Sequence, residues 1–148
     1  MDLIDTHQHL IYCDNIGYAW TDDVDVLKAR DFTLGDYRKL VEGKGIGRTL
    51  FMEVDASDGD YQDEARFFAG LVGNDGLSGF VASCRPETDA GFDAWLEEAI
   101  ALRVNGFRRI LHVVPDNVSQ SETFRRNVRK IGKAGLTFDI CMFARQHA

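Results

Sequence analysis

The chain has 148 residues, of which 45% are hydrophobic and 28% are charged, a size and composition that fit one domain with a buried core. Its formal net charge of −7 argues against general nucleic-acid binding, because an acidic surface repels phosphates. Three separated cysteines without a CxxC pair are typical of a reduced, cytoplasmic protein. The sequence predicts no signal peptide and no membrane segment.

The first predicted element is a strand over residues 3–9 that ends in two histidines. Residues i and i+2 of a strand point the same way, so His7 and His9 share one face, with Asp5 one step behind. Two imidazoles at this spacing can share a divalent ion, and a nearby carboxylate can orient them. A pair of surface histidines is the alternative, but their place at the end of an apolar strand favours a metal site.

A long polar connection is predicted over residues 10–32. Connections of this length in compact domains often form lids or binding loops. Tyr18 and Trp20 in this loop can line a substrate pocket or pack over the sheet, and solvated decoration is the third interpretation.

Four more strands are predicted, over residues 49–54, 79–84, 106–112 and 137–142, and their starts lie 30, 27 and 31 residues apart. Such a spacing matches strand–helix units with crossover helices. Helix starts are predicted at a Thr33/Asp36 capping box, at Asp60, at Asp89 and at a Ser119/Glu122 capping box.

The alternation of strands and helices predicts an α/β fold with a parallel sheet, either doubly wound or a TIM-barrel-like arrangement with about five of eight strands. Gly43, Gly45 and Gly47 precede a strand, whereas a dinucleotide-binding fingerprint requires glycines that open a helix. We therefore interpret these glycines as a helix stop and a turn.

Polar residues are concentrated at the carboxyl ends of the predicted strands, where barrels place their active sites. Glu53 can bind metal or substrate, although an ion pair with Arg48 or Arg85 is favoured. Arg108 and Arg109 alternate faces, so one of them can point toward the site and capture a carboxylate or carbonyl while the other points outward. Candidate roles for His112 are metal ligand, acid–base group or buried core residue.

Serine and cysteine nucleophiles are disfavoured. The sequence has no G-x-S-x-G motif, and Cys84 and Cys141 lie in apolar runs typical of a core.

The Asp5–His9 motif and the segment 106–116, with support from residues 135–140, resemble the amidohydrolase superfamily. The most similar branch is the amidohydrolase-related group that includes fuconolactonase-type sugar lactonases and 2-pyrone-4,6-dicarboxylate lactonase. The resemblance implies that residues 1–148 are the N-terminal portion of a distorted (β/α)8 barrel. It also implies that His7 and His9 are metal ligands and that Arg108 is a substrate anchor. The other candidate substrate-binding residues are Glu53, Trp20 and His112.

The resemblance implies hydrolysis of a lactone, or of a related small cyclic ester or amide, by activated water. The implied cofactor is a divalent metal, zinc in the first instance, although some lactonases of the branch work without metal. The general base is expected beyond Ala148, so we expect this chain alone to be inactive. An exposed sheet edge at residues 138–142 predicts either self-association into a homo-oligomer or a tendency to aggregate.

Two alternatives remain open at this point. One is a non-catalytic α/β scaffold for binding or assembly, derived from the barrel. The other is a phosphoesterase of the histidinol-phosphatase kind, which also opens with an HxH strand but uses more histidine and carboxylate ligands than four histidines readily supply.

Overall fold

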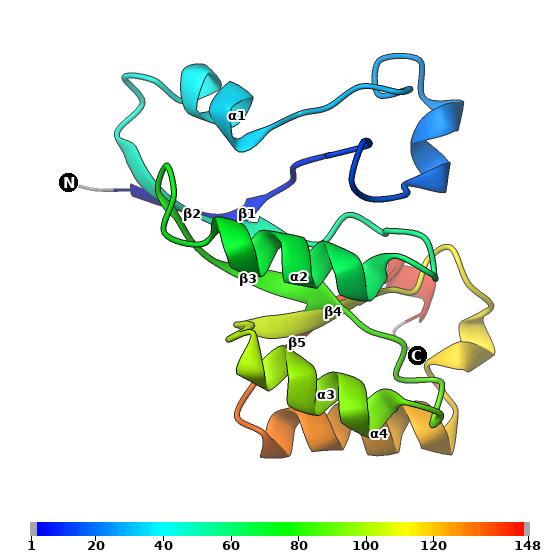
Figure 1. Ribbon diagram of the computed structural model, residues 1–148. Helices are drawn as coiled ribbons and strands as arrows, with labels where there is room; N and C mark the ends of the chain where they lie inside the picture. The colour runs from blue at the N-terminus through cyan, green and yellow to red at the C-terminus, as the bar shows by residue number, and fades with distance from the viewer. Residues whose placement is uncertain (1–2, 147–148) are drawn as a thin grey trace.

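The computed structural model describes residues 3–146 and contains a curled, five-stranded parallel sheet (Figure 1). The strands follow one another in the order β1-β2-β3-β4-β5. Their bounds are β1 (Leu3–Gln8), β2 (Ile46–Met52), β3 (Leu77–Ser83), β4 (Gly106–Ile110) and β5 (Thr137–Cys141). The sheet forms a half-barrel, which confirms the predicted α/β, incomplete TIM-barrel-like fold.

Helices connect the strands: α1 (Leu34–Leu40), α2 (Tyr61–Leu71), α3 (Phe92–Ala101) and α4 (Glu122–Lys133), with short 3-10 turns at Ala19–Asp23, Asp116–Val118 and Ala144–Gln146. In Figure 1, α2 lies along the sheet beside β3, and α3 and α4 lie together beside β4 and β5. Lys130 Nζ of α4 lies 2.5 Å from Asp93 Oδ1 of α3. Within residues 3–146, the helices lack the length and apolar character needed to cross a membrane.

Two of the four predicted helix starts are found as expected. Thr33 and Asp36 form the predicted capping box, in which Thr33 Oγ1 accepts a hydrogen bond of 3.2 Å from the Asp36 amide. Asp60 precedes α2 but makes no capping hydrogen bond with its side chain.

The other two start positions are wrong by two residues each. Gly91, in the left-handed region at φ 76°, is the N-cap of α3, and Asp89 instead pairs with Arg126 of α4. Ser121 caps α4 by accepting a 3.1 Å hydrogen bond from the Phe124 amide, so the box predicted at Ser119 does not form.

The strand bounds differ from the predicted ones most at β2, which starts three residues early at Ile46. Gly43 and Gly45 form the expected turn, with φ values of 72° and 75° that favour glycine. Gly47, predicted to belong to the turn, lies inside β2.

Apolar residues of the strands pack against the helices. Phe51 of β2 stacks on Phe68 of α2 with ring centroids 3.4 Å apart, and Phe107 of β4 lies edge-on to Trp95 of α3. Each such ring contributes about 1.5 to 3 kcal/mol when it is removed from water. Since side chains alternate along a strand, Arg108, the neighbour of Phe107, points to the opposite, concave face.

The long connection over residues 10–32 packs against this core, so solvated decoration is wrong. Ile16 and Tyr18 are buried, and the backbones of Ile11 and Phe32 pair as an isolated bridge. Four residues of this connection line a cavity at the carboxyl ends of the strands: Ile11, Trp20, Leu27 and Phe32.

Candidate active site

His7 of β1 and His9, which directly follows this strand, converge at its carboxyl end. His7 Nε2 and His9 Nε2 lie 3.2 Å apart, with the two rings nearly perpendicular. His9 Nδ1 donates a hydrogen bond of 2.9 Å to the Met52 carbonyl, which leaves Nε2 of a neutral ring unprotonated. Although part of the residue is open to solvent, loss of water around the ring lowers the pKa of His9 despite the bond to Met52.

Asp5 does not orient either imidazole, contrary to the prediction. Its Oδ1 accepts a 3.0 Å hydrogen bond from the His7 amide, and its Oδ2 accepts a 2.7 Å bond from the Tyr37 hydroxyl. Asp5 therefore fixes the backbone of β1 against α1, and the Met52 carbonyl holds the His9 ring.

A buried ion pair beneath the histidines joins Glu53, directly after β2, to Arg108 of β4. Arg108 Nε donates to Glu53 Oε1 at 2.5 Å, and Nη2 donates to the Glu53 carbonyl. The two side chains are 8% and 0% exposed. The favoured partners of Glu53 in the sequence, Arg48 and Arg85, are therefore wrong, because the fold places Arg108 against it.

The third guanidinium nitrogen of Arg108, Nη1, lies 3.4 Å from His7 Nε2. Arg109 points away and pairs with Glu87 at 2.7 Å, as alternation along β4 predicts. The ion pair below and the imidazole above fix Arg108 in one orientation, so the guanidinium is preorganised.

A cavity of about 570 Å³ opens at the carboxyl ends of the strands. Four of the predicted site residues line it: His9, Trp20, Arg108 and His112. Trp20 Nε1 donates a 2.7 Å hydrogen bond to the Val54 carbonyl, so the loop holds this ring at the cavity wall. The remaining lining residues are mainly apolar: Ile11, Leu27, Phe32, Val54, Asp55, Ile110, Val113 and Cys141.

The other two candidates lie beside this cavity. His7 shares a neighbouring hollow of about 510 Å³ with Arg108 and β5. Glu53 does not line either space, because it is fully buried behind Arg108. Its place in the site is to hold the guanidinium.

Two polar residues of the cavity wall were not among the predicted site residues. Asp55 has φ 57°, in the left-handed region that costs a non-glycine residue about 1 to 2 kcal/mol. A 2.9 Å hydrogen bond from its amide to Glu53 Oε2 holds this conformation. Burial raises the pKa of Asp55, and the nearby Glu53 carboxylate adds to the shift. Its position just beyond the end of β2 was the signal available in the sequence.

Cys141 is the second. It is partly exposed in the cavity wall, with Sγ 3.6 Å from His112 Nδ1, so its predicted place in the core is wrong. Only the register of the folded sheet reveals this: Cys141 pairs with Ile110, and both face the same concave side as Arg108.

The donor set of His7 and His9 fits part of a divalent metal site. Two nitrogen ligands at the usual zinc distance of about 2.0 to 2.1 Å and a tetrahedral angle are separated by about 3.3 Å, close to the 3.2 Å found here. Among residues 3–146, no group of three or more His, Cys, Asp or Glu side chains is arranged to hold a metal ion. The histidine pair thus offers two ligands, and the Arg108 guanidinium competes with a cation for His7 Nε2.

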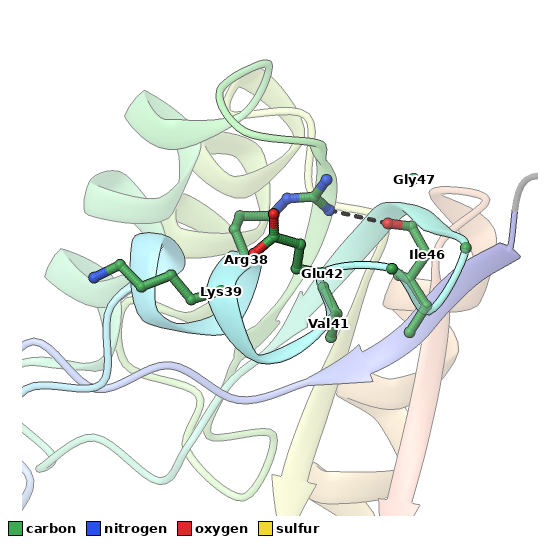
Figure 2. A pocket seen from close by; sticks show the side chains of 8 residues that line it. Arg38, Lys39, Val41, Glu42, Ile46 and Gly47 are labelled. Atoms are coloured by element: carbon green, nitrogen blue, oxygen red, sulfur yellow. Dashed lines mark hydrogen bonds between the residues drawn. The ribbon is translucent and has the colours of Figure 1, made fainter.

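A hollow of similar size, about 520 Å³, lies at the opposite end of the sheet, between α1 and the start of β2 (Figure 2). Arg38 Nη1 donates a 3.2 Å hydrogen bond to the Ile46 carbonyl there. The turn with Gly43 and Gly45 forms its rim. No residue predicted for the site lines this hollow.

A sequence model of the amidohydrolase family matches residues 4–148 of the chain. No curated protein matches it. Among solved structures, an amidohydrolase from Burkholderia multivorans with bound HEPES matches with a TM-score of 0.80 and 21% identity, over 99% of this chain and 50% of that chain. A second Burkholderia multivorans structure, with bound zinc, has a TM-score of 0.77 and 21% identity, over 99% and 51% of the respective chains.

A protein from Acinetobacter baumannii described as a probable 2-pyrone-4,6-dicarboxylic acid hydrolase, with citric acid bound, has a TM-score of 0.62 at 12% identity. The match covers 95% of this chain and 49% of that one. At these identities the structures establish the fold. This chain spans about half the length of each of them.

Proposed function

Because the chain belongs to the amidohydrolase family, we propose that it carries the metal- and substrate-binding part of a hydrolase site that opens a lactone, or a related cyclic ester or amide, by attack of activated water. The observation that carries the proposal is the convergence of His7, His9 and Arg108 at the carboxyl ends of the strands, beside a cavity of about 570 Å³. In barrels of this kind, that end holds the active site.

His7 and His9 would hold the divalent metal, for which zinc is our candidate because their ring nitrogens have a suitable separation. When bound, such an ion polarises a carbonyl or lowers the pKa of a water molecule. A catalytic zinc usually has three protein ligands. We therefore propose that a further ligand and the general base come from residues outside this chain, and that the chain alone does not turn over substrate.

Arg108 is the proposed anchor for the carbonyl or a carboxylate of the substrate. Glu53 occupies Nε and Nη2, so Nη1 is the guanidinium nitrogen nearest the histidine pair. Trp20 would pack against the face of a ring substrate, and His112 would hydrogen-bond to its polar edge on the far wall. Glu53 contributes by fixing the orientation of Arg108.

Calorimetric titration of the zinc-loaded chain with a sugar δ-lactone and with 2-pyrone-4,6-dicarboxylate tests this site. We expect binding of at least one of these probes, weakened about tenfold or more by Trp20→Ala or His112→Gln because each removes a wall contact. Lys39→Ala at the opposite hollow is the matched control and leaves affinity unchanged. Absence of binding, or equal affinities in all variants, would contradict the proposal.

The second candidate is a non-catalytic binding or assembly scaffold. It is favoured by apolar exposure along the last strand and beyond it, where Ile140 and Phe143 are 59% and 50% exposed. Under this alternative, lactone affinity does not change when zinc is added or removed. Elemental analysis of the metal-replete chain and titrations with and without chelator separate the two candidates.

A further inference from the structure

The ends of β4 and β5 bring a thiol and an imidazole together. Cys141 Sγ lies 3.6 Å from His112 Nδ1, within the range of a hydrogen bond to sulfur. A 2.7 Å backbone hydrogen bond from the Leu111 amide to the Cys141 carbonyl fixes this part of the ladder. The His112 ring also packs beside Phe143, with centroids 5.2 Å apart. These contacts hold the imidazole next to the sulfur atom.

Cys141 is partly exposed. Cys141 lines both the cavity of about 570 Å³ and the neighbouring hollow of about 510 Å³, and His112 lines the first of them. A small organic molecule that enters either space therefore meets the thiol. The charged side chains along these spaces are Arg108, Asp55 and Asp139, so both signs of charge are present.

The other two cysteines provide contrasting environments within the same chain. Cys84 is 0% exposed, and burial raises the pKa of its thiol well above the usual value. The Cys13 thiol donates a weak hydrogen bond of 3.6 Å to the Arg30 carbonyl, and loss of solvent raises its pKa. Neither of these two environments supplies a base, whereas His112 can accept the proton of Cys141.

We propose that Cys141 and His112 form a nucleophilic dyad, and that Cys141 is a covalent-modification site for small soft electrophiles such as α-halo carbonyl compounds. A thiol beside an imidazole within reach is the arrangement that activates cysteine nucleophiles. In the reaction, a bond forms between Sγ and the α-carbon, the carbon–halogen bond breaks, halide leaves, and the thiol proton passes to His112 Nδ1. This chemistry requires neither the metal nor the water of the proposed hydrolysis.

The test is alkylation of the folded chain with iodoacetamide at pH 7, with each cysteine followed by mass spectrometry. We expect Cys141 to react about threefold to tenfold faster than Cys13, because His112 Nδ1 lies within reach of its thiol proton, whereas the Arg30 carbonyl beside Cys13 cannot take up a proton. Cys84 should remain unlabelled, which makes it an internal reporter of folding.

The matched variant is His112→Gln, which removes the base and keeps a side chain of similar size. We expect it to slow labelling of Cys141 to the rate of Cys13 and to leave Cys13 itself unchanged. Labelling of Cys84 in this variant would show that it is unfolded, and His112→Asn would then be used in its place. The ratio of the Cys141 and Cys13 rates in the unaltered chain tests the proposal independently of either variant. Equal rates for Cys141 and Cys13, or a Cys141 rate unaffected in the folded variant, would overturn the proposal.

Discussion

The carboxyl and amino ends of the sheet carry hollows of about 570 and 520 Å³, respectively. The two ends differ in how far their charged side chains are buried and paired. At the amino end, Lys39 is 81% exposed in its side chain, and Arg38 bonds a single backbone carbonyl (Figure 2). At the carboxyl end, Arg108 and Glu53 are buried against each other beneath two imidazoles. Cavity size therefore does not distinguish the two ends, whereas the burial and pairing of their charged side chains does.

Buried charges cost free energy that a structural role alone seldom requires. Desolvation of a paired guanidinium and carboxylate can exceed their attraction, and apolar replacements are often neutral or stabilising. The left-handed Asp55 adds backbone strain at the same end. Proteins retain such unfavourable buried charges and backbone strain where a group must be held in one orientation. The proposed role of Arg108 as a substrate anchor requires such an orientation.

The largest effect is expected from Arg108→Met, which leaves the Glu53 carboxylate buried without its partner. The free energy of unfolding should fall by about 3 to 5 kcal/mol in urea denaturation. Arg38→Met at the other end is the control and should cost less than about 1 kcal/mol, because its environment is partly open to water. Similar losses for the two variants would remove the contrast between the ends. The double variant Arg108→Met/Glu53→Met should recover much of the loss.

The next effect concerns Glu64, a buried residue of α2 near the carboxyl end of β2. Burial raises its pKa to about 8, with a further contribution from Glu53. A carboxyl whose pKa is raised by folding stabilises the protein fully below its ordinary pKa, and this contribution is lost as pH rises toward 8. Between those values stability should fall by up to about 1.4 kcal/mol per pH unit.

Urea denaturation from pH 5 to 8 measures this slope, which Glu64→Gln should flatten. Glu98→Gln is the control, since hydrogen bonding to Arg66 lowers the pKa of the exposed Glu98 and its contribution is lost at acidic pH instead. A Glu64→Gln slope equal to that of the unaltered chain would show that Glu64 is ionised in the fold.

The next effect, on zinc affinity, compares two histidine positions within the carboxyl end. The double variant His7→Ala/His9→Ala should weaken zinc binding more than about tenfold, because it removes both nitrogen ligands. His112→Ala should retain it, as this residue lies away from the pair and contacts Cys141. Competition with a chromogenic chelator provides the affinities. Unchanged binding in the double variant would assign zinc to other residues.

The smallest effect is on self-association through β5, which stays a prediction. Ile140 on this strand is 59% exposed, and lysine on an edge strand opposes pairing with another chain. Sedimentation velocity across concentration should show weaker association for Ile140→Lys, by up to about 1 kcal/mol. Leu40→Lys on α1, where Leu40 is 76% exposed, is the matched control. A strictly monomeric unaltered chain would contradict the prediction.

Much of the fold could be predicted because its signals are local. The Thr33/Asp36 capping box, the strand–helix spacing and the opposite directions of Arg108 and Arg109 depend on neighbours within a few residues. A predicted helix start was wrong where a nearby residue took the N-cap position instead. Gly91 adopts the left-handed conformation before α3, and Asp89 pairs with Arg126, which is distant in the sequence.

The sequence by itself determined the parallel α/β architecture and the strand-end positions of the site candidates, because alternation and strand–helix order are properties of short segments. Tertiary structure decided the partners. Glu53 meets Arg108, the His9 ring meets the Met52 carbonyl, and Cys141 meets His112. These contacts join residues 55, 43 and 29 positions apart. Their geometry depends on strand register and on the curl of the sheet, and neither is encoded in the pattern of any one segment.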